Sequence, residues 1–267
     1  MSALDKAVGF VNAIRRACPA YNVAVPHALL RAFNLYATSA FSRKEIVGYG
    51  LFVPSIANAL PVLISKERSL AKLGTLNPPA LQHLTEDKDE FHQICARHGL
   101  PVPATFGWTR DGVAYDADGR RIDSKEAWAS HLAARLPREF IVKDRAGAYG
   151  SGFRAFERVS DRFIAAEDGT SLDAASLADL LSGPLGSDLI VQERLYDHSA
   201  LATLSGRRGL QTARINTILS GDGRVELLFF MVKILAGHTL SDNFSMGTTG
   251  NLIAFGDLDQ GDRKSVV

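Results

Sequence analysis

The sequence has little excess charge of either sign and few cysteines. Thirty Lys and Arg stand against 29 Asp and Glu among 267 residues, which leaves a formal charge of +1. This balance provides no overall field to hold a nucleic acid or an anionic membrane, so we expect no nucleic-acid partner. Cys18 and Cys95 lie far apart without a metal-ligand spacing, which fits a reducing compartment better than a disulfide-linked fold. We therefore expect a cytoplasmic protein.

Long apolar runs are also missing. No uninterrupted apolar stretch follows the charged N-terminal residues, as a signal peptide would require, so we expect no secretion. The most apolar window, 47–65, is long enough to span a bilayer but is interrupted by glycines, prolines and Asn58. We interpret it as buried helix and loop and expect no transmembrane segment. Peripheral membrane contact through an interfacial helix is the less favoured alternative.

Two kinds of pattern divide the chain. Helix-like stretches separated by prolines fill residues 3–80. A sharper amphipathic helix is predicted over Glu86–His98, with Thr85 as its N-cap, Cys95 in the core and Gly99 at its end. This first part of the chain is therefore predicted to be helical.

From residue 102 onward, short β-like runs dominate. The expected strands are Thr105–Trp108, Phe140–Lys143, Leu189–Gln192, Thr212–Leu219 and Val225–Leu235, with a hairpin around Asp116–Gly119. Helical spacing returns in Ser124–Leu136 and Leu172–Leu181. The turn between the last two strands makes them antiparallel neighbours. An α+β or α/β lobe is predicted.

The most informative segment is Phe140–Phe153, a strand that ends in Lys143 and runs into a glycine-rich loop. Glycine permits the turns and close backbone approach that point several N–H groups at one anion, and Lys143 adds a positive charge. The order of residues excludes a P-loop and a dinucleotide-binding fingerprint. The alternative is an ordinary glycine turn after a strand with a snorkelling lysine.

Several segments together resemble one family. Thr85–Phe91 with Gly99–Ala104 resembles the start of an ATP-grasp domain, and Leu189–Leu195 resembles its adenine-binding hinge strand. Gln211–Thr217 and Ser241–Gly247 resemble segments of the sugar-transfer-associated ATP-grasp proteins, the hexapeptide-transferase-associated type of polysaccharide biosynthesis. The resemblance spans roughly residues 66–261.

The resemblance implies an α+β ATP-grasp fold, in which two lobes sandwich ATP. It divides the chain into a helical region 1–84, a first lobe 85–188 with the strand lysine and glycine-rich lid, and an incomplete second lobe 189–267. The expected partners are a nucleotide and a small-molecule or saccharide-linked substrate.

The resemblance also assigns site residues. Arg214 and Lys143 would be catalytic. The residues implied to bind the nucleotide are Lys88, Lys143, Gly147, Gly150, Ser151, Gly152, Gln192, Glu193, Leu195, Asp197, His198, Asn216, Asp242 and Asn243. Among these, Lys143 and the lid would hold the phosphates, residues 192–195 the adenine, and Asp197 or His198 the ribose.

Plainer interpretations of some of these residues stay open. Arg214 and Asn216 share one face of a strand and could form its polar outer side. Asp242 and Asn243 could belong to a simple turn. His198 and His238 are more often surface or packing histidines than catalysts.

One departure from the family concerns the metal. ATP-grasp enzymes are expected to bind Mg²⁺ with a late acidic residue and a Glu-x-Asn pair, but no Glu-x-Asn occurs here. We therefore assign no metal ligand; Asp257 and Asp259 would more often be solvated. Either the chain is C-terminally truncated or it has abandoned metal-dependent catalysis.

The expected cofactors are ATP and, from the family alone, Mg²⁺. The leading hypothesis is a carboxylate–amine ligase that acts through an acyl phosphate. The alternatives are an ATP-binding protein without turnover and a small-molecule kinase.

Overall fold

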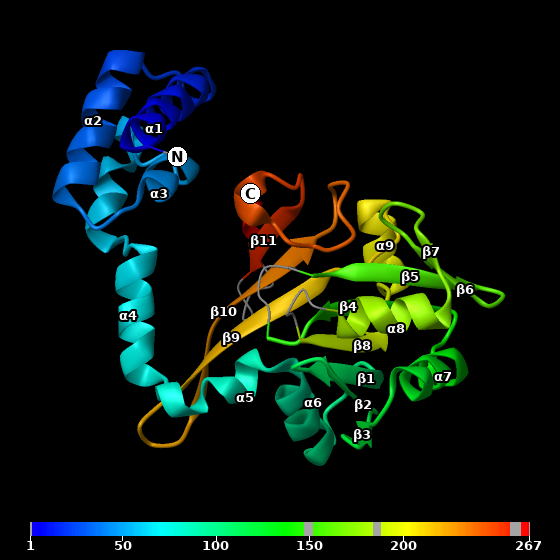
Figure 1. The fold of residues 1–267 in the computed structure, drawn as a ribbon. Coiled ribbons are helices and arrows are strands. Elements are labelled where there is room, and N and C mark those ends of the chain that lie inside the picture. Colours follow the sequence, from blue (N-terminus) through cyan, green and yellow to red (C-terminus); the bar gives the residue numbers. More distant parts are fainter. Residues whose placement is uncertain (1, 147–151, 184–187, 257–262, 267) are drawn as a thin grey trace. The chain divides into compact units, whose positions relative to one another are not determined.

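A computed structural model describes residues 2–146, 152–183, 188–256 and 263–266 (Figure 1). The chain forms two compact units, Met1–Gln82 and His83–Val267. Lid residues Gly147, Gly150 and Ser151, and also Asp257 and Asp259, lie outside the described residues.

The first unit is helical, as its proline-separated segments predicted. Its elements are α1 (Ala3–Ala17), η1 (Cys18–Tyr21), α2 (Val25–Thr38), α3 (Arg43–Gly48), η2 (Pro54–Val62), α4 (Lys66–Leu76) and η3 (Pro79–Leu81). Ser2 and Ser42 begin α1 and α3 with reciprocal capping boxes. The core of the unit gathers apolar residues of α1, α2 and α3 with Leu51, Phe52 and Val53. The predicted buried stretch within 47–65 therefore holds for residues 51–53, whereas Val62, Leu63 and Ile64 are exposed.

The second unit is built on an eight-stranded antiparallel sheet in the order β3-β2-β1-β8-β4-β5-β6-β7. These strands are β1 (Thr105–Arg110), β2 (Val113–Tyr115), β3 (Arg121–Ile122), β4 (Glu139–Asp144), β5 (Arg154–Val159), β6 (Arg162–Ala165), β7 (Ser171–Leu172) and β8 (Leu189–Glu193). Although we expected β8 to open the second lobe, it pairs with β1 and β4 inside this sheet.

Helices α7 (Lys125–Arg135) and α8 (Ala174–Ser182) supply the other half of the main core. Trp128, Leu132, Leu177 and Leu181 pack with Phe140 and other inward side chains of the sheet. Side chains alternate along a strand, so Phe140 and Val142 of β4 enter this core while Ile141 and Lys143 point to the opposite face. Because Phe140 and Val142 must enter the core, Lys143 is placed on the opposite face of β4.

The rest of the second unit consists of short helices and a smaller sheet. Helices α5 (His83–Glu86), α6 (Lys88–Arg97) and α9 (Ser199–Ser205) and the 3-10 turn η4 (Ser245–Gly247) accompany the sheets. The smaller antiparallel sheet has the order β12-β11-β10-β9, with β9 (Thr212–Leu219), β10 (Val225–Ile234), β11 (Leu252–Gly256) and β12 (Arg263–Val266).

These observations confirm an α+β fold and correct some local predictions. The helix predicted over Glu86–His98 is α6, which begins at Lys88, while Glu86 belongs to α5. The cap of α6 is Asp87 rather than Thr85, because the Asp87 carboxylate accepts from two backbone N–H groups. Cys95 is buried as predicted. Strands β5, β6, β7, β11 and β12 were missed. Within the described residues, no helix is long and apolar enough to cross a bilayer.

We predict that Gly107→Ala destabilises the second unit. A Cβ atom at this position of β1 would lie 2.6 Å from Cη2 of Trp128 and 2.7 Å from the carbonyl oxygen of Tyr115. Overpacking against a buried indole and fixed backbone typically costs about 1–3 kcal/mol, which urea unfolding would measure. Gly221→Ala is the control, since nothing lies within 4 Å of that Cβ position. Equal stability of the two variants would contradict the prediction.

Candidate functional site

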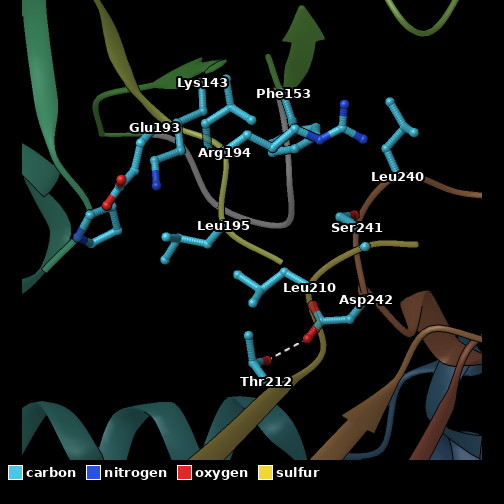
Figure 2. Close-up of a pocket in the computed structure, with 13 residues that line it drawn as sticks. Lys143, Phe153, Glu193, Arg194, Leu195, Leu210, Thr212, Leu240, Ser241 and Asp242 are labelled. Atoms are coloured by element: carbon cyan, nitrogen blue, oxygen red, sulfur yellow. Dashed lines mark hydrogen bonds between the residues drawn. The ribbon is translucent and has the colours of Figure 1, made fainter. Parts of the chain in front are cut away.

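The second unit contains a cavity of about 220 Å³ between its two sheets (Figure 2). Side chains from β4, the segment after β8, the start of β9 and the loop after β10 line it. The lining residues are Pro103, Ile141, Lys143, Phe153, Glu193, Arg194, Leu195, Gly209, Leu210, Thr212, Leu240, Ser241 and Asp242. The cavity therefore combines an apolar majority with a few charged groups, as small-molecule sites usually do.

Lys143 brings a positive charge into this cavity with little solvent around it. Burial, and to a lesser extent the charge of Lys88, lower the pKa of Lys143 from 10.5 to about 8. The ammonium group is thus held where an anion would relieve both its desolvation and the repulsion from Lys88. This is the arrangement expected of a phosphate-binding lysine.

Lys88 reaches the same region from a different element. It is the first residue of α6, and both its backbone N–H and its Nζ donate to the carbonyl oxygen of Arg145, at 3.0 and 3.3 Å. Burial lowers the pKa of Lys88, while Asp144 and Asp87 oppose the change. Two lysines that lie 55 positions apart in the sequence therefore share one electrostatic environment.

A buried ionic cluster holds these two elements together. The Arg145 guanidinium binds the Asp87 carboxylate and donates to Asp188 at 2.7 Å. It also lies over the Trp108 ring, 5.9 Å from its centroid, and Arg110 approaches Asp87 at 3.7 Å. Because Asp87 caps α6 and Arg145 follows β4, the cluster sets the distance between Lys88 and Lys143.

Of the predicted lid, Gly152 is the glycine whose structure is described. Its φ is +66°, and a Cβ atom there would collide with the carboxylate of Asp144. The backbone can therefore pass close to Asp144 only without a side chain. The next residue, Phe153, lines the cavity.

The predicted hinge forms one wall of the cavity. Glu193 and Leu195 line it, together with Arg194. Glu193 exchanges two hydrogen bonds with Ala104, as its N–H donates to the carbonyl at 2.9 Å and its Oε1 accepts at 2.8 Å. Gln192 is buried behind this wall and donates to Thr105 at 3.0 Å, while its Oε1 is buried without a hydrogen-bond partner.

A polar network anchors the hinge to the sheet. Glu139, the first residue of β4, accepts a hydrogen bond from the Tyr196 hydroxyl at 2.5 Å and one from Arg208 at 2.9 Å. The Tyr196 hydrogen bond is the main cause of the lowered pKa of Glu139. Arg194 and Arg208 both lie over the Tyr196 ring. Residues 194–196 are therefore held at a fixed position beside β4.

The structure gives Asp197 and His198 structural contacts, and neither lines the cavity. Asp197 accepts from the Gln211 backbone N–H at 2.5 Å and from its side-chain amide at 2.7 Å. His198 caps α9, with Nδ1 accepting from Ala200 N–H at 3.3 Å. Ribose binding by Asp197 or His198 stays a prediction.

A second group of polar residues faces the cavity from the smaller sheet. The Thr212 hydroxyl donates to Asp242 (Figure 2), and Lys233 lies 3.9 Å from the same carboxylate. Lys233 is directly opposite Thr212 in the β9–β10 register. The polar stripe of β9 therefore begins at the cavity and is extended by a cation on β10.

Arg214 and Asn216 continue the stripe of Thr212 along β9, as the strand alternation predicted. Arg214 is exposed and does not line the cavity. The Nδ2 atom of Asn216 is buried without a hydrogen-bond partner. A buried, unpaired donor is unfavourable, so this atom marks a place where a bound acceptor would be stabilising.

Asn251 fixes the loop that carries Asp242 and Asn243. Its buried side-chain amide donates to Thr239 at 3.0 Å and to the carbonyls of Ser241 and Asn243 at 2.9 and 3.0 Å, and its Oδ1 accepts from Gly237. Asn243 does not line the cavity. Hydrogen bonds from Asn251 to residues 237–243 therefore hold this loop together, which is more than a simple turn.

The described residues do not fit a resident divalent cation at this site. They contain no group of three or more His, Cys, Asp or Glu side chains that could hold a metal. Asp242 is the cavity carboxylate nearest to the smaller sheet, and Thr212 and Lys233 already engage it. Mg²⁺ requires several oxygen ligands, so we derive no step through it.

The sequence analysis did not identify three sets of residues that position the site. Asp87 and Arg145 act as a pair across the fold, and no local pattern connects them. Asn251 organises its loop through contacts that no motif announces. Lys233 had a signal, because it is the sole Lys or Arg of the apolar strand Val225–Ile234.

Comparison with known proteins gives one match. The family model described as sugar-transfer associated ATP-grasp matches residues 68–267, which is most of the chain. No curated protein and no solved structure matches the chain.

Removal of the Arg145 charge is predicted to destabilise the second unit strongly. Arg145→Met removes the buried partner of the Asp87 carboxylate and leaves only Arg110, 3.7 Å away, and breaking a buried pair from one side costs about 3–5 kcal/mol. Chemical denaturation measures the loss. Arg138→Met is the matched control, since Arg138 pairs with Glu157 at the surface and such pairs contribute roughly 0–1 kcal/mol. A loss below that of the control would show that the cluster does not stabilise the fold.

Lys143→Met is predicted to raise the free energy of unfolding at pH 7. The pKa of Lys143 is about 8 in the folded state against 10.5 for a free lysine, so folding penalises the protonated form by as much as about 3 kcal/mol. The penalty is complete below pH 8, because both states are then protonated, and it fades as pH rises from 8 to 10.5. Urea unfolding at pH 7 and pH 10 should therefore show a gain that shrinks with pH. An equal gain at both values would indicate better packing instead.

Proposed function

The chain belongs to the sugar-transfer associated ATP-grasp family, and from this premise we propose that it binds ATP in the cavity and works as a carboxylate–amine ligase. The observation that carries the proposal is Lys143, a poorly solvated lysine that lines the cavity and whose ammonium group is repelled by a second poorly solvated lysine, Lys88. Positive charge of this kind is unfavourable in the empty protein and favourable beside a polyphosphate.

The lining of the cavity supports a nucleotide in one orientation. Ile141, Leu195, Leu210 and Leu240 offer apolar surface to a flat base, next to the hinge formed by residues 193–195. Lys143 lies near the end of β4, and Phe153 directly follows Gly152. We infer that the base contacts the hinge and the phosphates extend to Lys143, Lys88 and the glycine-rich loop, where backbone N–H groups can converge.

The reaction that we propose uses ATP as the source of a phosphoryl group that converts a carboxylate into an acyl phosphate, from which an amine displaces phosphate. The residues of this chain would act through position and charge. Lys143 would keep the phosphates close to the acceptor. Arg214, on the stripe that runs from Thr212, would neutralise charge that develops on the phosphoryl oxygens, and the unpaired Asn216 amide would orient the acceptor.

The family name connects the protein with sugar transfer, and this supports a saccharide-linked substrate in polysaccharide or sugar-conjugate biosynthesis. The polar stripe of β9 would then receive the acceptor, whereas the apolar part of the cavity would receive the base. Asp242, held by Thr212 and Lys233, stands between the two regions.

A second function is nucleotide binding without turnover. It is supported by the scarcity of acidic ligands, since the described residues contain no group that could hold a metal. Phosphoryl transfer usually requires a cation bridging the phosphates. Release of ADP, measured under conditions in which ATP is bound, separates a ligase from a protein that only binds.

We predict that ATP affinity falls about ten-fold between pH 7 and pH 9. The Lys143 ammonium, with a pKa of about 8 before binding, is mostly protonated at pH 7 and mostly neutral at pH 9. Titration calorimetry of the unmodified chain measures the change. Lys143→Ala should abolish binding together with the rise in Tm that ATP causes.

Lys143→Arg is the decisive control for the pH dependence. A guanidinium stays charged over this range, so the affinity of this variant should be the same at pH 7 and pH 9 even where it is weaker overall. If the ATP affinities of the unmodified chain and of Lys143→Arg changed equally with pH, Lys143 would not be a phosphate-binding residue. Unchanged ATP binding by Lys143→Ala would refute the assignment of the cavity.

A further inference from the structure

The near-neutral total charge hides an uneven distribution between the two units. Residues 1–82 carry nine Lys and Arg against three Asp and Glu, a formal charge of +6. Residues 83–267 carry 21 against 26, a formal charge of −5. The first unit is therefore strongly basic, although the whole chain provides no net field. A basic unit attached to an acidic one indicates an anionic partner for the first unit alone.

The first unit also exposes a contiguous stretch of apolar side chains at its C-terminal end. This segment comprises the end of η2, the link to α4 and α4 itself, residues 62–76. Its exposed apolar side chains, with their exposed fractions, are Val62 (83%), Leu63 (42%), Ile64 (53%), Leu70 (54%), Leu73 (46%) and Leu76 (57%). Exposure of so many large apolar groups in sequence is unusual for a surface that meets only water.

Helix α4 has little packing within the first unit to account for its stability. It buries none of its residues, yet short helices are marginal in water unless an amphipathic face packs against something. Its first turn is fixed to the unit, because buried Ser65 accepts from the Arg68 N–H at 3.3 Å and Glu45 accepts from the Lys66 N–H at 2.7 Å. In the remaining turns, Leu70, Leu73 and Leu76 are each about half exposed.

The charges of α4 complement its apolar stripe. Leu70, Leu73 and Leu76 follow one another at three-residue spacing, and Arg68 and Lys72, four residues apart, are neighbours on the helix surface. Lys72 also lies four residues before Leu76, so the two cations border the C-terminal end of the apolar stripe. Both cations are exposed. Leucines beside a basic face are the pattern of helices that lie in the interface of a membrane, with the apolar side chains among the acyl chains and the cations at the headgroups.

We propose that residues 62–76 bind peripherally to the surface of an anionic lipid bilayer and that the basic first unit is the membrane-binding part of the protein. A bilayer satisfies both observations at once, because it offers apolar volume for the leucines and negative headgroups for the +6 unit. A second copy that made contact through its own residues 62–76 would bring the same positive charge and is disfavoured by repulsion. This proposal does not depend on ATP binding.

The test is co-sedimentation of the full chain with lipid vesicles. The vesicles consist of phosphatidylcholine alone or of an equal mixture of phosphatidylcholine and phosphatidylglycerol. We expect binding to the mixed vesicles at low salt and little binding to the neutral ones. Each cation near an anionic surface contributes about five-fold, so Arg68→Gln with Lys72→Gln should weaken binding roughly 30-fold. Leu70→Gln with Leu73→Gln should weaken it by about ten-fold or more, because glutamine keeps the helix but removes apolar area.

Matched variants and a second measurement keep the proposal falsifiable. Arg120→Gln with Arg224→Gln removes the same charge from exposed positions of the second unit and should leave vesicle binding unchanged. Far-UV circular dichroism and Tm confirm that each variant is folded. Equal loss in the matched variant, or equal binding to neutral vesicles, overturns the proposal. So does self-association in sedimentation velocity that the leucine variant abolishes, since a second copy would then be the occupant.

Discussion

The buried pair of Arg145 and Asp87 is the interaction on which the candidate site depends. Asp87 caps α6 and Arg145 follows β4, so their contact joins the start of one element to the end of another. Lys88 directly follows Asp87, and Lys143 precedes Arg145 by two positions. The remaining carboxylate, Asp188, completes the charge balance from the residue before β8. A single ionic cluster therefore supports the lysines, the central strand and the approach to the hinge.

The ionic cluster around Arg145 also affects the electrostatics of the site. Lys143 loses hydration at the cavity and is repelled by the charge of Lys88, and its lowered pKa reports that penalty. The carboxylates of Asp87 and Asp188 engage Arg145, and Lys143 lines the cavity. The ion pairs of Arg145 with Asp87 and Asp188 thus hold the poorly solvated Lys143 ammonium in place. Groups with perturbed pKa values of this kind are common at functional sites. Charge is also divided unevenly between the units, because the first carries an excess of positive charge and the second an excess of negative charge.

Much of the fold could be predicted because its signals are local. The proline-separated helices of the first unit, the β9–β10 hairpin and the strand before the glycine loop all follow from patterns within a few residues. Strands β5 and β6 were missed, because Arg154, Arg158 and Arg162 interrupt the alternation that marks a strand. Arg158 is accommodated by carbonyls of α7 and the residue after it, Ala133 and Leu136, which sequence patterns do not reveal. Similarly, β8 belongs to the larger sheet because its pairing is decided by β1 and β4.

By itself, the sequence determined the α+β class, the family resemblance, and the placement of Lys143 before a glycine-rich loop, because strand alternation and glycine geometry act over short distances. It also determined the uneven charge of the two units. The tertiary structure alone decided that Arg145 binds Asp87, 58 positions away, that Lys233 joins Thr212 and Asp242, and that α4 buries none of its residues. The physical reason is that charge pairing and burial depend on which distant segments the fold brings into contact.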